Sequence, residues 1–129
     1  MTSVGEVLPE LTIDVSPTFV VSTALATRDF QDVHHDRDKA IARGSKDIFV
    51  NILTDTGLVQ RYVTDWAGPN AVIKSISLRL GVPWYAYDTV TFRGEVLAIE
   101  DGVITVKVVG SNSLGDHVIA TATLTIGGA

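Results

Sequence analysis

The stretch IFVNILTDTGLVQRYV, residues 48–63, decides the fold, because it is the one good helical segment in the middle of the chain. A mostly apolar set of positions recurs at helical spacing and forms one stripe: Ile48, Ile52, Thr56, Val59 and Val63, widened by Leu53 and Leu58. Ser45 or Asp47 can cap its start. The Gly68-Pro69 pair stops it, so we expect the helix to end before Trp66.

The sequence after this helix alternates apolar and polar residues, which is the pattern of strands with one buried face. The segments with this pattern are residues 76–80, 90–98 and 120–126. A further strand, residues 103–109, is apolar on both faces except at Thr105 and Lys107. Glu100-Asp101-Gly102 is a tight hairpin signal between this strand and residues 90–98. We therefore expect a meander of about four antiparallel strands.

Two interpretations compete for residues 18–27, ahead of the helix. Phe19-Val20-Val21 is typical of a strand because of β-branching. Ser16-Pro17, however, suits the N-cap and first residue of a helix of about two and a half turns, and we expect that helix. A long helix ahead of an antiparallel meander predicts an α+β fold, with the sheet wrapped around a central helix. This is the hotdog architecture, here as a single domain over residues 1–129.

Composition and charge exclude several classes of function. Of the 129 residues 46% are hydrophobic and 19% charged, which suits a compact globule that hides one face against a partner. A net charge of −5 argues against nucleic acid and membrane surfaces, since both bind basic footprints. The chain has no cysteine for disulfides, metal thiolates or nucleophiles. No signal peptide or membrane span is visible, so we expect a cytoplasmic protein.

The loop DFQDVHHD, residues 29–36, contains two of the three histidines and suggests chemistry. Asp29 and His34 could jointly hold and deprotonate a water molecule. His35 fits an exposed or structural role better than a catalytic one. Asp36 and Asp38 fit capping or solvating the turn that follows.

Other interpretations of the acids and histidines stay open. The loop could be a solvated surface, or a metal site made of its possible ligands: Asp32, His34, His35 and Asp36. Adjacent side chains converge poorly on one ion, so we do not expect a metal. His117 follows a turn at the start of a strand, where we expect it on the surface. Asp55 and Asp65 are expected on the polar faces of the helix.

The loop resembles the signature of MaoC-like (R)-specific enoyl-CoA hydratases, which have the hotdog fold. That signature runs aspartate, any residue, Asn-Pro, an aliphatic residue, histidine, five residues and a small residue. Asp29, Val33, His34 and Ala40 occupy the aspartate, aliphatic, histidine and small positions. The order of the expected elements agrees with the family over nearly the whole chain.

Two departures from the family indicate a divergent branch. Gln31-Asp32 replaces Asn-Pro, and Val50-Asn51 replaces a His-Gly pair whose backbone N–H helps to bind the thioester oxygen. A backbone donor survives any side chain, so Asn51 can still supply it. The chain most resembles the small subunit of the heteromeric steroid side-chain hydratases of actinobacteria.

The resemblance implies an enzyme that adds water across the double bond of a 2-enoyl-CoA thioester, here a steroid side-chain acyl-CoA in cholesterol degradation. It implies Asp29 and His34 as the catalytic pair, the backbone N–H of Asn51 as oxyanion donor, and no cofactor. It also implies a partner, a second, longer MaoC-like subunit, in a heterotetramer with two copies of each. Two alternatives stay open: a non-catalytic partner of a related hydratase or dehydratase, and a hotdog thioesterase.

Overall fold

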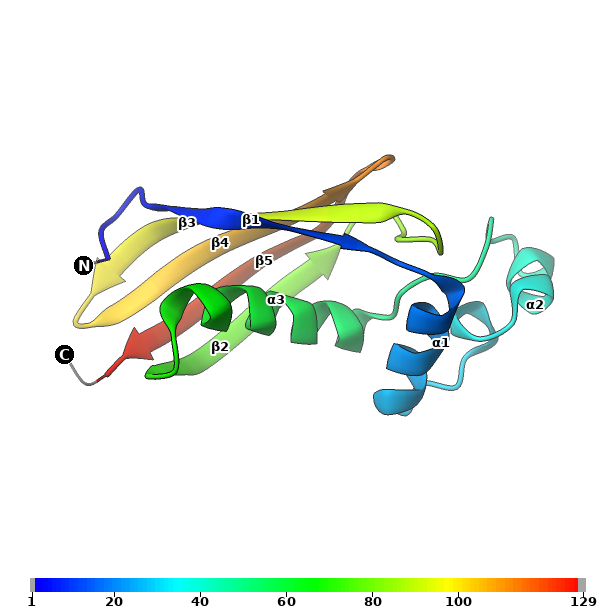
Figure 1. The fold of residues 1–129 in the computed structure, drawn as a ribbon, viewed down its shortest axis with the longest axis horizontal. Helices are drawn as coiled ribbons and strands as arrows, with labels where there is room; N and C mark the ends of the chain where they lie inside the picture. Colours follow the sequence, from blue (N-terminus) through cyan, green and yellow to red (C-terminus); the bar gives the residue numbers. More distant parts are fainter. Residues whose placement is uncertain (1, 128–129) are drawn as a thin grey trace.

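In the computed structural model, which describes residues 2–127, a five-stranded antiparallel sheet curls around one long helix (Figure 1). Along the chain the elements are β1 (Val7–Asp14), α1 (Pro17–Ala26), the 3-10 turn η1 (Asp32–His34), α2 (Arg37–Ala42), α3 (Ile52–Ala67), β2 (Ala71–Leu80), β3 (Thr89–Glu100), β4 (Val103–Asn112) and β5 (Gly115–Ile126). Figure 1 shows α1 and α2 gathered at the end of the molecule where α3 begins. Among these residues no helix combines the length and apolarity needed to cross a bilayer.

The strand order is β1-β3-β4-β5-β2, which corrects the predicted four-stranded meander. The prediction missed β1, since Pro9 and a register shift between Leu8 and Leu11 interrupt its alternation. It also expected β2 beside β3, whereas β2 pairs with β5. The reason is that α3 crosses the face of the sheet and carries the chain to the opposite edge before β2 begins.

The prediction of α1 is confirmed, with Ser16 as N-cap accepting the Phe19 N–H at 3.1 Å and Pro17 in the first turn. The predicted start of the central helix was wrong, because Asn51 caps α3 and accepts the Thr54 N–H at 3.3 Å. Residues 48–50 instead run extended beside residues 84–86. The helix also continues two residues further than expected, to Ala67.

The core lies between α3 and the concave face of the sheet. Its α3 members are Leu58, Val59, Tyr62 and Val63, and its sheet members include Val90, Phe92, Val96, Val106, Ala120, Ala122 and Leu124. The Tyr62 ring approaches the sheet so closely that a Cβ at Gly94 would lie 2.9 Å from its Cε2. A side chain at position 94 would therefore push the helix away from the sheet.

Candidate active site

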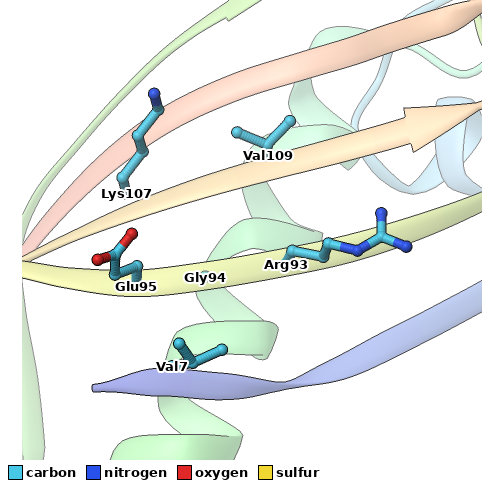
Figure 2. Close-up of a pocket in the computed structure, with 6 residues that line it drawn as sticks. All are labelled: Val7, Arg93, Gly94, Glu95, Lys107 and Val109. Carbon is cyan, nitrogen blue, oxygen red and sulfur yellow. The ribbon is translucent and has the colours of Figure 1, made fainter. Parts of the chain in front are cut away.

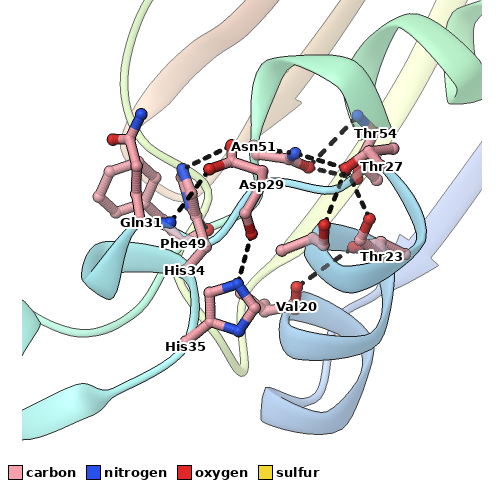
Figure 3. A network of polar contacts seen from close by, with 11 residues as sticks. Val20, Thr23, Thr27, Asp29, Gln31, His34, His35, Phe49, Asn51 and Thr54 are labelled. Atoms are coloured by element: carbon pink, nitrogen blue, oxygen red, sulfur yellow. Dashed lines mark hydrogen bonds and ion pairs between the residues drawn. The ribbon is translucent and has the colours of Figure 1, made fainter.

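The position of Asp29 follows from the way α1 ends. The Asp29 N–H donates to the Ala24 carbonyl at 2.9 Å and the Arg28 N–H to the Leu25 carbonyl at 3.0 Å. Arg28 takes a left-handed φ of 56°. This is a Schellman ending, which turns the chain sharply away from the helix axis. The Asp29 carboxylate then accepts the Gln31 N–H at 3.2 Å and lies between His34 and the Asn51 amide (Figure 3).

His34 comes from η1, and its buried ring is held by the extended segment ahead of α3. Its Nδ1 lies 2.7 Å from the Phe49 carbonyl oxygen, and its ring packs edge-on against the Phe49 ring. Because a carbonyl oxygen only accepts, Nδ1 carries the hydrogen of this bond. In the neutral ring Nε2 is therefore an acceptor, and it faces Asp29.

The two groups expected to form the catalytic pair lie side by side. Nε2 of His34 is 3.4 Å from Oδ2 of Asp29, with the side chains 8% and 18% exposed. That separation leaves no room for a water molecule between them. A water lying against both atoms can instead donate one hydrogen to each, which orients its oxygen lone pairs outward. The arrangement suits the activation of a single water molecule.

Asn51 is the third member of the site, and its side chain makes contacts that the sequence did not reveal. Its amide donates to Thr27 Oγ1 at 2.8 Å and to Asp29 Oδ2 at 3.2 Å. Its carbonyl oxygen accepts from the backbone and hydroxyl of Thr54 at the start of α3. Asn51 is 2% exposed and therefore fixes the carboxylate from the buried side. Its backbone N–H makes no hydrogen bond within residues 2–127.

The remaining polar residues of the loop have separate partners. The His35 Nε2 donates to the Asp29 carbonyl oxygen, and the ring stacks on Phe30. Asp32 pairs with Arg43 at 3.2 Å. Asp36 caps α2, as the sequence suggested. Within residues 2–127 no three side chains of metal-ligand type are grouped so that they could hold an ion.

Asp55 and His117 correct two predictions. His117 was expected on the surface, yet it is 1% exposed, and Asp55 was expected on a polar helix face, yet it is 0% exposed. His117 Nε2 lies 2.8 Å from Asp55 Oδ1, and Nδ1 lies 2.7 Å from the Val82 carbonyl oxygen. Helical spacing could have placed Asp55 inside, since it lies three and four residues before the buried Leu58 and Val59. Asp65 is exposed, as expected.

The charge of this buried pair follows from its hydrogen bonds. Burial raises the pKa of Asp55 and so opposes its ionisation. Burial alone would lower the pKa of His117, but the Asp55 carboxylate and the Val82 carbonyl outweigh it and hold that pKa above its ordinary 6.5. Both ring nitrogens face acceptors, so we assign the charged ring paired with the carboxylate.

Two open hollows of the chain are lined by residues other than Asp29 and His34. One, of about 340 Å³, lies on the sheet, and Figure 2 shows its lining: Val7, Arg93, Gly94, Glu95, Lys107 and Val109. The other, of about 360 Å³, is lined by residues 30–33 of the loop and by Arg43. Neither includes Asp29, His34 or Asn51 in its lining.

Comparison with known proteins identifies the relatives of the chain. No family model matches it. It is 80% identical over 126 residues to the 3-oxo-4,17-pregnadiene-20-carboxyl-CoA hydratase beta subunit of Mycobacterium tuberculosis, covering 98% of both chains. The chain belongs to this hydratase beta-subunit family. The resemblance inferred from the Asp29–His34 loop is thereby confirmed.

Solved structures support the same assignment to the hydratase beta-subunit family. The chain superposes with a TM-score of 0.96 on a chain of the ChsH1-ChsH2 complex from Mycobacterium tuberculosis, at 80% identity over 98% of this chain and 100% of that one. It also matches the (R)-hydratase from A. caviae involved in PHA biosynthesis, with a TM-score of 0.90 at 20% identity over 98% of both chains. The second likeness shows the shared hotdog fold, which confirms the predicted architecture.

Proposed function

We propose that this chain is the beta subunit of an enoyl-CoA hydratase that adds water to the double bond of an unsaturated steroid side-chain acyl-CoA. The observation that carries the proposal is the 80% identity, over nearly the whole chain, to a protein named as such a subunit. The likeness to a chain of the ChsH1-ChsH2 complex supports a second subunit as partner. We further propose that this partner is a longer MaoC-like subunit and that two copies of each assemble. The proposal places the reaction in the cytoplasm, in the breakdown of cholesterol.

In the proposed mechanism Asp29 and His34 hold the attacking water. Nε2 of His34 and Oδ2 of Asp29 each accept one of its hydrogens, which aims its oxygen at the β-carbon. As the carbon–oxygen bond forms, a proton of the water passes to the pair and the double-bond electrons move to the thioester oxygen. The pair then returns one proton to the α-carbon, so its own protonation is unchanged over the cycle. Water and proton add on the same face.

The thioester oxygen becomes an enolate during the reaction and needs donors. We propose that the backbone N–H of Asn51 donates to it, aided by the positive end of the α3 dipole. The side-chain amide of the same residue restrains the Asp29 carboxylate. Asn51 would therefore stabilise the enolate oxygen through its backbone and position the attacking water through its contact with Asp29.

The test uses the purified complex with the longer subunit and an unsaturated steroid side-chain CoA thioester in ¹⁸O-labelled water. We expect a hydroxyacyl-CoA that carries one ¹⁸O atom, with no release of free CoA thiol. Thiol release without hydration would indicate a thioesterase. A complex that leaves the thioester unchanged would reject the proposed reaction.

A further inference from the structure

The buried Asp55–His117 pair lies outside the loop of residues 29–36. Hydrogen bonds nevertheless connect the pair to Asn51, which holds Asp29, and through residues 82–84 to the segment that holds His34. We infer that Asp55 and His117 are positioning residues for hydration: together they fix the distance between His34 and Asp29 from inside the core. This inference rests on the proposed function. It concerns residues that neither touch the substrate nor belong to the loop.

The first connection runs through α3 to Asp29. Asp55 lies in the first turn of α3, and its N–H donates to the Asn51 carbonyl oxygen at 3.2 Å. The Asn51 amide in turn donates to Asp29 Oδ2. A single helical turn is stiff because its hydrogen bonds fix the backbone. The hydrogen bond between His117 and the Asp55 carboxylate therefore fixes the position of the Asn51 amide. The Asn51 amide in turn fixes the Asp29 carboxylate.

The second connection runs through the segment after β2 to His34. The His117 Nδ1 donates to the Val82 carbonyl oxygen at 2.7 Å. Two residues further, the Trp84 carbonyl accepts the Val50 N–H at 3.0 Å. Residue 49, the neighbour of Val50, supplies the carbonyl that holds His34 Nδ1. The ring of His117 thus fixes the position of residues 48–50, the extended segment that orients His34.

The strand that carries His117 is itself held rigidly at this point. The Gly81 N–H donates to the His117 carbonyl oxygen at 2.7 Å. A Cβ at Gly81 would lie 2.2 Å from the Asp116 carbonyl oxygen, so the two backbones approach more closely than any side chain permits. The imidazole of His117 therefore projects into the core from a backbone whose position is fixed.

Stability alone gives no reason for a charged pair at this position. An apolar pair of similar volume packs as well in a core and escapes the desolvation of two ionisable groups. Asp55 and His117 are 0% and 1% exposed, so that desolvation is nearly complete. Hydrogen bonds have preferred distances and angles, so the charged pair restrains α3 against the segment that contains Val82 more narrowly than apolar contacts alone would.

The test compares three variants in the complex with the longer subunit: Asp55→Asn, His117→Gln, and the double variant Asp55→Ala/His117→Leu. The double variant keeps the volume and is expected to fold even if the single variants do not. Val63→Ala is the control, because Val63 is buried on the same helix about 12 Å further from the site. The measurements are kcat and KM for hydration, the melting temperature, and the ¹⁵N signals of the His34 ring.

We expect every pair variant that folds to lose about 10- to 100-fold in kcat with little change in KM, since a misplacement of about 1 Å costs that much. We also expect the His34 ring to lose its fixed Nδ1–H form, while Val63→Ala keeps activity at an equal loss of melting temperature. Wild-type kcat and an unchanged His34 ring in the double variant would overturn the inference. A wild-type complex that hydrates nothing would reject the proposed function, and the His34 signals would still test the positioning.

Discussion

At the scale of single residues, Asn51 combines two structural duties that mutations can separate. Its Oδ1 caps α3, and its Nδ2 holds Asp29. A serine at position 51 can cap the helix but is too short to donate to Asp29, whereas an alanine can do neither. Activity and stability should therefore respond differently to the two changes.

We expect Asn51→Ser and Asn51→Ala to lose similar amounts of hydratase activity, because both remove the donor to Asp29. The free energy of unfolding should fall by about 1 kcal/mol more for Asn51→Ala, which also loses the cap. Urea denaturation and steady-state kinetics measure the two effects. If Asn51→Ser keeps full activity, the amide does not position Asp29.

His117 gives a prediction with a definite sign. Its pKa is raised above 6.5 in the folded protein, so its contribution to stability is complete below about pH 6.5 and is lost as the pH rises through the folded pKa. We expect the difference in unfolding free energy between wild type and His117→Gln to shrink from about pH 6.5 upward. Urea denaturation over that range measures it, and a difference that grows with pH would contradict the charged assignment.

The sequence placed Asp29 and His34 on one loop, and the structure brings their side chains to 3.4 Å. It did not reveal the pairing of Asp55 with His117, since those residues are 62 positions apart and only the fold joins them. The side-chain role of Asn51 was hidden for the same reason. The spacing of residues within one loop predicts which side chains can act together. Contacts between side chains of different elements depend on how those elements pack.

At the scale of elements, α3 was predictable and the sheet order was not. The buried positions Val59 and Val63 follow the predicted stripe, whereas Ile52 and Leu53 of the same stripe are 48% and 52% exposed. The spacing of apolar residues predicts which face of a helix is buried, but it does not predict how far the buried surface extends. Strand pairing depends on which edge the chain reaches after α3, and alternation within β2 contains no information on that choice.

Gly57 tests how α3 is stabilised. It lies in the exposed middle of the helix, and a Cβ there would meet no atom within 4 Å. Glycine costs about 1 kcal/mol relative to alanine in a helix interior. We expect Gly57→Ala to raise the unfolding free energy of the chain by up to about that amount in urea denaturation. A destabilised variant would show that the space beside Gly57 is needed by the fold.

At the scale of the whole molecule, apolar side chains are left exposed beside the site. Phe30 is 70% exposed, and Ile52 and Leu53 at the start of α3 are about half exposed. Exposed apolar groups gathered around a site indicate a surface that a partner covers. Phe30 follows Asp29 in the chain, and Ile52 follows Asn51, whose amide contacts Asp29. A longer subunit that covers these side chains would therefore also close the site.

We expect Leu53→Lys to weaken binding of the longer subunit by at least about tenfold, since a buried lysine without a partner is costly. Leu97→Lys is the matched control, because Leu97 has a similar exposure of 47% but lies on β3. Isothermal titration calorimetry compares the two. Weakening by Leu97→Lys alone would place the partner on the sheet instead.

The most direct test of the account is the hydration rate of the Asp29→Asn complex. Asparagine keeps the shape of the side chain but cannot take up a proton from water. We predict a loss of about 100-fold or more in kcat, with the complex intact and its melting temperature nearly unchanged. Hydration at the wild-type rate would contradict the account and show that this chain supports a partner that carries the chemistry.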